Sequence, residues 1–133
     1  MTLLNILFVG LGGFIGAILR YGTGQLLPVQ NGFPLPTLMI NLTGCFFLAW
    51  FYTATLHRWV LPPAIRLGVG TGLIGAFTTF STFSVETLHL LHNGQILQAI
   101  IYVLASIIGG ILLSACGLKS AQMMQKGKGM KIH

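Results

Sequence analysis

The sequence predicts an all-α membrane protein with four transmembrane helices, the third of which is broken near its middle. Of the 133 residues, 54% are hydrophobic and only 6% are charged, whereas a typical soluble domain has roughly 25% charged residues. Four apolar segments follow one another, each close to the ~20 residues that a bilayer-spanning helix requires. A soluble surface cannot be built from this composition, so we predict an integral, multi-pass membrane protein.

The four predicted spans cover residues 3–27, 36–56, 64–91 and 95–118. The short links between them contain the proline, glycine and asparagine residues that typically end helices. No soluble domain fits into these links. We therefore expect residues 1–125 to form a single four-helix transmembrane domain, followed by a basic tail at residues 126–133.

Small residues recur at helical spacing in two of these segments. Gly12 and Gly16 form one GxxxG pair in the first span, and Gly68 and Gly72 form another in the third. Such pairs allow two membrane helices to approach closely. Both segments are therefore predicted to take part in tight helix packing.

The net charge of +6 comes mainly from the C-terminal end of the chain. Its four lysines are Lys119, Lys126, Lys128 and Lys131. No pattern of alternating aromatic and basic residues accompanies them, so a nucleic-acid partner is not expected. Basic residues beside a membrane span instead fix its orientation or contact anionic lipid, and the positive-inside rule predicts a cytoplasmic C-terminus.

The run GAFTTFSTFS at residues 75–84 is unusual for a membrane span. Phe77, Phe80 and Phe83 recur at every third position, four hydroxyl residues fill the gaps between them, and a fifth, Ser84, follows. A polar, poorly helical stretch at membrane depth is tolerated where it is buried in protein or lines a watery cavity. The run therefore indicates a pathway or a binding site, with a helix break near residues 75–79 whose freed carbonyls form a negative end suited to a cation.

Three other polar residues in the spans allow two interpretations each. Asn41 in the second span either joins two helices through its amide or donates a hydrogen bond to a passing anion. Arg20 either extends to the interface or concentrates anions at an aqueous mouth. Glu86, the one acidic residue of the chain, is either a functional carboxylate or an interfacial cap.

Polar side chains also form a narrow stripe on the fourth span. Tyr102 and Ser106 lie four residues apart and so share one helical face. A stripe of this kind joins helices or lines a path. Aromatic rings have positively polarised edges, so rings, hydroxyls and an amide together suit an anion that must bind weakly enough to leave again.

Three blocks of the sequence resemble the Fluc (CrcB-type) fluoride channels. They are GGFIGAILRY at residues 12–21, TLMINLTG at residues 37–44 and GAFTTFSTF at residues 75–83. The third block is highly specific, and the likeness extends over all four spans in order. The resemblance implies an antiparallel, dual-topology homodimer with two fluoride pathways, which exports fluoride passively across the cytoplasmic membrane.

The resemblance also implies roles for particular residues. Phe80 and Phe83 would present ring edges to fluoride, with Asn41 as their amide partner. The backbone carbonyls of Gly75 and Thr78, two from each subunit, would hold a structural Na⁺ at the dimer interface. The rest of the implied pathway consists of polar residues, namely Tyr102 and Ser106 along the track, Ser81, Thr82 and Glu86 at one mouth, and Arg20 near an aqueous vestibule.

Two features depart from this pattern. Gly110 stands where the track along the fourth span would offer a further hydroxyl, and the charge distribution predicts one orientation where the resemblance implies both. Two other functions remain open, a small proton-coupled multidrug exporter that would use Glu86 and a non-transporting membrane assembly subunit. An enzyme is not expected, because no nucleophile motif or metal-ligand spacing is present in the sequence.

Overall fold

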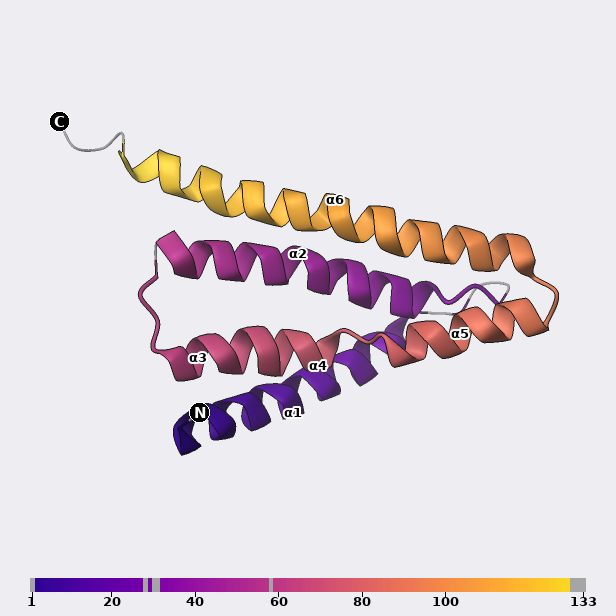
Figure 1. Ribbon diagram of the computed structural model, residues 1–133, viewed down its shortest axis with the longest axis horizontal. Helices are drawn as coiled ribbons and strands as arrows, with labels where there is room; N and C mark the ends of the chain where they lie inside the picture. Colours follow the sequence, from indigo (N-terminus) through magenta and orange to yellow (C-terminus); the bar gives the residue numbers. More distant parts are fainter. Residues whose placement is uncertain (1, 28, 30–31, 58, 130–133) are drawn as a thin grey trace.

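The computed structural model describes residues 2–27, 29, 32–57 and 59–129, and these fold into a layered bundle of helices (Figure 1). Lys131 and the rest of the tail from residue 130 lie outside the described residues. Helix α6 lies uppermost in Figure 1, followed by α2, then by the row of α3, α4 and α5, with α1 crossing beneath. The start of α1 and the end of α6 lie toward the same end of the bundle.

Three helices are long and apolar enough to cross a membrane. They are α1 (Leu3–Leu26), α2 (Leu35–His57) and α6 (Ile96–Gly129), with spanning stretches at Leu3–Leu26, Leu35–Leu56 and Ile96–Met124. Each contains the ~20 apolar residues that the hydrocarbon core demands. The prediction of an all-helical chain with several membrane spans is confirmed.

The predicted third span is divided into two halves by a break. The first half is continuous from α3 (Pro63–Leu67) through η1 (Gly68–Ile74) to α4 (Gly75–Phe77), and the second half is α5 (Ser81–His92). Thr78, with φ −76° and ψ 159°, is extended and ends the first half. The predicted break is therefore confirmed, although it lies at residues 78–80, at the C-terminal edge of the expected interval.

The segment η1 is a π-helix, with one more residue per turn than an α-helix. Three glycines, Gly68, Gly70 and Gly72, are buried within it. A methyl group added at Gly70 would overlap the hydroxyl and ring of Tyr52 on α2. The widened turn therefore brings its backbone against an aromatic ring, a feature that the sequence pattern does not predict.

The two predicted GxxxG pairs pack against each other. A Cβ at Gly12 would overlap the carbonyl oxygen of Gly68, and one at Gly72 would lie 2.6 Å from the carbonyl oxygen of Val9. Gly16 lies against the backbone of Leu73 in the same way. Backbone contact at this distance is possible because no side chain intervenes, so α1 and η1 form the tightest helix pair in this half of the bundle.

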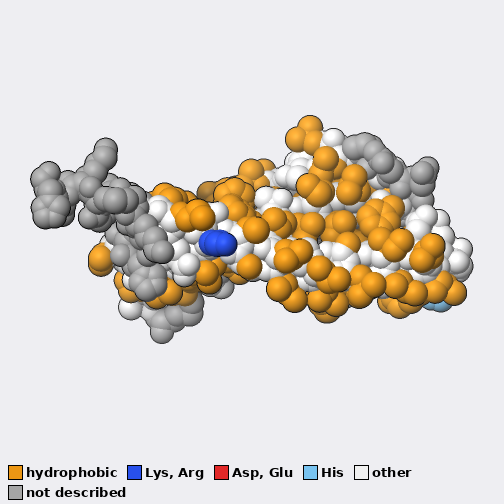
Figure 2. Space-filling view, turned by 90° about the horizontal axis from the view of Figure 1, so that it is seen from above, with side chains coloured by type: hydrophobic (Ala, Val, Ile, Leu, Met, Phe, Trp, Pro, Cys, Tyr) orange, Lys and Arg blue, Asp and Glu red, His pale blue; other side chains and the backbone are white. Residues whose placement is uncertain are grey.

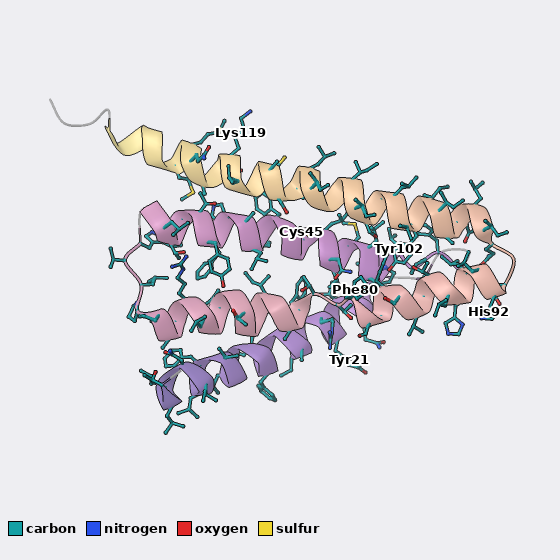
Figure 3. The ribbon with its side chains drawn as sticks, viewed as in Figure 1. Tyr21, Cys45, Phe80, His92, Tyr102 and Lys119 are labelled. Atoms are coloured by element: carbon teal, nitrogen blue, oxygen red, sulfur yellow. The ribbon has the colours of Figure 1, made fainter. Side chains whose placement is uncertain are left out.

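The other half of the bundle is built on α2 and α6, which lie side by side along most of their length (Figure 1). A turn with Gly94 at φ 72° joins α5 to α6. Helix α6 continues past the expected end of the fourth span at residue 118 to Gly129. Figure 2 shows hydrophobic side chains over much of the face on which α6 lies, and Figure 3 shows Lys119 on α6.

Candidate functional site

The amide of Asn41 on α2 creates the break in the third span. Its Oδ1 accepts a hydrogen bond from the backbone N–H of Thr79 at 2.8 Å, and its Nδ2 donates to the carbonyl of Thr79 at 2.9 Å. In a continuous helix the Thr79 N–H would bond the carbonyl of Gly75. The side chain of Asn41 replaces that partner, so the first half of the span ends at Phe77.

The hydroxyl of Thr79 completes the break from the other side. Thr79 is nearly buried, and its Oγ1 accepts the backbone N–H of Thr82 at 3.2 Å. The same oxygen donates to the hydroxyl of Thr82 at 3.0 Å and lies 3.4 Å from that of Ser81. Since the Thr82 N–H would otherwise bond the carbonyl of Thr78, the Thr79 side chain acts as a cap at the start of α5.

Two backbone carbonyls lose their helical partners as a result. Those of Gly75 and Thr78 are the carbonyls that the N–H groups of Thr79 and Thr82 would have occupied. The Gly75 oxygen accepts the Thr78 hydroxyl at 3.3 Å, and Nη1 of Arg20 lies 3.5 Å from the Thr78 oxygen. Both oxygens lie at the negative end of a half-helix, and each keeps a free lone pair, so this donor set fits a small hard cation.

Aromatic side chains line up from the break toward α6. The ring centroids of Phe80 and Phe83 are 5.8 Å apart, and those of Phe83 and Tyr102 are 5.0 Å apart. Phe80 is 80% exposed, whereas Tyr102 has no exposed surface. Figure 3 shows Phe80 at the break and Tyr102 between α5 and α6, so the row leads from an open surface into the bundle.

A groove of about 360 Å³ lies beside this row, between α2, the break and α6. Asn41, Phe80, Phe83 and Ser106 all line it, so four of the predicted fluoride-pathway residues meet here, together with Thr78. The Ser106 hydroxyl donates to the carbonyl of Tyr102 on its own helix at 2.7 Å, which leaves its lone pairs toward the groove. None of the described residues that line the groove carries a charge.

A second cavity, of about 310 Å³, lies on the opposite side of the break. Thr82 and Glu86, two of the three residues that the resemblance assigned to a mouth, line it together with Arg20. Thr79 lines both this mouth cavity and the groove. The pair of Thr79 and Asn41 is therefore the partition between the two spaces.

Glu86 is held by hydrogen bonds from two other helices. Its Oε1 accepts the hydroxyl of Thr37 at 2.8 Å, and its Oε2 accepts the hydroxyl of Tyr102, also at 2.8 Å. Thr37 and Tyr102 are both buried. The carboxylate thus joins α2, α5 and α6, and Tyr102 links the mouth cavity to the aromatic row.

The structure brings most of the predicted site residues together, but in two groups. Ser81 lines neither cavity, and its hydroxyl contacts the site through Thr79. The sequence analysis missed Thr79 and Thr37, which hold Asn41 and Glu86, and Cys45, which lines the groove. The four-residue spacing of Asn41 and Cys45 on α2 was the available signal.

The chain matches a known protein family over most of its length. A family model described as "CrcB-like protein, Camphor Resistance (CrcB)" matches residues 7–118, which include the break and both cavities. The chain belongs to this family. It is 47% identical over 119 residues to "Fluoride-specific ion channel FluC 1" of Bacillus cereus, with 88% of this chain and 87% of the relative covered.

Two further relatives are similar to this CrcB-like chain over nearly its whole length. "Fluoride-specific ion channel FluC 2" of Geobacillus kaustophilus is 45% identical, with 90% of this chain and 95% of the relative covered. "Fluoride-specific ion channel FluC" of Oceanobacillus iheyensis is 48% identical, with 92% and 95% covered. The family and the apolar helices together identify a multi-pass membrane protein that transports rather than catalyses.

Proposed function

We propose that this CrcB-like protein is a passive, fluoride-selective channel that exports fluoride across the cytoplasmic membrane. The observation that carries the proposal is the groove in which Phe80, Phe83, Asn41 and Ser106 meet. Relatives that share more than two fifths of their residues with this chain are named fluoride-specific channels. The groove's chemistry and those names point to the same small anion.

The groove suits a weakly held anion. Ring edges are positively polarised, and the row from Phe80 to Tyr102 offers several of them in succession. One N–H of Asn41 Nδ2 is used on Thr79, and the other is available to an ion in the groove. Because the lining has no fixed charge, an anion binds without being trapped, which conduction requires.

The exposed surfaces support a dimer. Phe80 is 80% exposed at the break, and Gly75 is exposed beside it. A second copy, packed antiparallel so that the two breaks meet, covers both and closes the groove on each side. We infer that α1, α2, the broken segment 63–92 and α6 make four crossings per subunit, with two pores per dual-topology dimer.

A structural Na⁺ at this interface completes the proposal. The carbonyl oxygens of Gly75 and Thr78 would hold it, two from each subunit, and it would neutralise the negative ends of the two half-helices that meet there. The guanidinium of Arg20 lies near the Thr78 oxygen. With Na⁺ bound, it would either share this carbonyl with the ion or turn toward the mouth cavity. The ion's role would be to join the subunits.

Fluoride efflux from liposomes tests the proposed function. Purified protein in vesicles loaded with fluoride should release it to a fluoride electrode without a proton gradient, while chloride stays inside. Phe80→Ile and Phe83→Ile should cripple efflux with the dimer still forming, whereas Phe14→Ile, an exposed phenylalanine on α1, should not. Unchanged fluoride release by both groove variants would contradict the role of the ring edges.

The alternative of a proton-coupled multidrug exporter makes a different prediction. It requires a carboxylate that exchanges protons and substrate, and Glu86 is the candidate. Both oxygens of Glu86 already accept buried hydroxyls, which favours a structural role for it. Proton-dependent drug transport that Glu86→Gln abolishes would reverse this conclusion.

A further inference from the structure

The groove does not end at Ser106. Its lining continues between α2 and α6 to Cys45 and Ile107, on the side away from the break. Asn41 and Cys45 are four residues apart on α2, so they present the same face to α6. Figure 3 shows Cys45 between these two helices. The α2–α6 seam thus begins at Asn41 and Ser106 and leads to a thiol.

Gly110 on α6 faces this thiol. It is buried one turn after Ser106, and a Cβ built on it would lie 3.5 Å from the sulfur of Cys45. Along this face of α6, polar groups recur at four-residue intervals from Tyr102, and Gly110 is the position without one. Ser114 follows, with its hydroxyl 3.5 Å from the carbonyl of Cys45. The thiol of Cys45 therefore supplies a polar group at the level of Gly110, where α6 itself has no side chain.

We propose that the ion path continues from the rings along the α2–α6 seam and that the thiol of Cys45, opposite Gly110, lines its narrow continuation. A thiol is a weak hydrogen-bond donor with a polarisable sulfur, so it extends the weakly binding character of the groove. This inference rests on the proposed fluoride channel. It adds a lining residue and a direction for the path.

A small thiol reagent tests the seam. Methyl methanethiosulfonate reacts with the cysteine thiolate once its proton has passed to solvent. The cysteine sulfur attacks the methylthio sulfur, the reagent's S–S bond breaks, a new disulfide forms and methanesulfinate leaves. Reaction at Cys45 therefore adds one methylthio group inside the seam.

The two cysteines of the chain supply a matched pair of variants. Cys116→Ser leaves a thiol at Cys45, and Cys45→Ser leaves one at Cys116, which is exposed on α6. Each variant is assayed for fluoride efflux before treatment, after treatment and after reduction, and mass spectrometry counts its methylthio groups. We expect treatment to lower efflux through Cys116→Ser by about tenfold, because the added group fills a narrow path, and reduction to restore it. Efflux through Cys45→Ser should not change on treatment.

The possible results separate the two proposals. Wild-type vesicles that release no fluoride would overturn the channel itself and this inference with it. Fluoride release that persists in fully methylthiolated Cys116→Ser would overturn the seam alone. So would a Cys45 thiol that stays unmodified while Cys116 reacts completely, since a lining residue must be reached by a molecule of this size.

Discussion

Replacing Asn41 with leucine removes both hydrogen bonds that create the break while nearly keeping the volume of the side chain. The bonds measure 2.8 and 2.9 Å, and their loss leaves the N–H and carbonyl of Thr79 without those partners in a nearly buried position. A buried group without a partner costs about 1–3 kcal/mol in a soluble protein. Interhelical hydrogen bonds within membranes average about 0.6 kcal/mol and reach about 1.7.

We take the membrane values because the unfolded helices stay in lipid and find other partners there. Two bonds then give a loss of about 1–3 kcal/mol in the unfolding free energy. Fluoride efflux should fall as well, since the Thr79 N–H becomes free to rejoin the carbonyl of Gly75 and the position of Phe80 then changes.

Unfolding in mixed detergent micelles measures the first effect. Trp50 and Trp59 pack edge to face with centroids 5.5 Å apart, which supplies a native fluorescence signal. Thr43→Val on the same helix is the control, because the Thr43 hydroxyl bonds the carbonyl of Met39 within its own helix. An unfolding free energy for Asn41→Leu within about 0.5 kcal/mol of wild type, or a loss in Thr43→Val of equal size, would refute the assigned role.

Two further predictions use the same unfolding assay. Gly12→Ala should lose about 1–3 kcal/mol, because the added methyl overlaps the carbonyl of Gly68 and backbone must move; Gly10→Ala, with nothing within 4 Å of its added methyl, should be neutral, and equal losses in both would contradict the close contact. Tyr102→Phe should cost about 0.6–1.7 kcal/mol, because it removes the 2.8 Å interhelical hydrogen bond to a Glu86 oxygen but keeps the ring. Wild-type stability of that variant would show that the bond contributes nothing.

The sequence could predict those features that have local causes. The spacing of Gly12 and Gly16 identified a helix face without side chains, and such a face typically packs closely against another helix. The run from residue 75 placed the break to within a few residues, because Gly, Thr and Phe together are poor helix formers. Helical periodicity also placed Tyr102 and Ser106 on one face.

The features that the sequence could not predict depend on which groups meet across helices. Two interpretations of Asn41 stood level because the spacing along α2 does not say which backbone group it faces. Glu86 likewise could not be paired with Tyr102, since the two lie on different helices and the turn at Gly94 sets their relative position. The contact of Cys45 with Gly110 could not be predicted for the same reason, since the two residues lie on different helices.

The length of α6 shows a different limit. Hydropathy falls after residue 118, and the span was expected to end there, but the helix continues to Gly129. Apolar character marks where lipid ends, whereas helix formation depends on the backbone. The residues after 118 include good helix formers such as alanine, methionine and glutamine, so the helix leaves the apolar region without ending.

The break also has a consequence for the way the chain enters the bilayer during synthesis. Helix α5 has 12 residues, and the half from Pro63 to Phe77 is little longer, so neither half reaches the ~20 residues of a self-sufficient span. We therefore expect segment 63–92 to insert into the bilayer poorly without contacts to the other helices. The glycine face of α1 is synthesised before this segment and packs against the backbone of η1. We therefore expect contact with α1 to stabilise the first half within the membrane before α6 is synthesised.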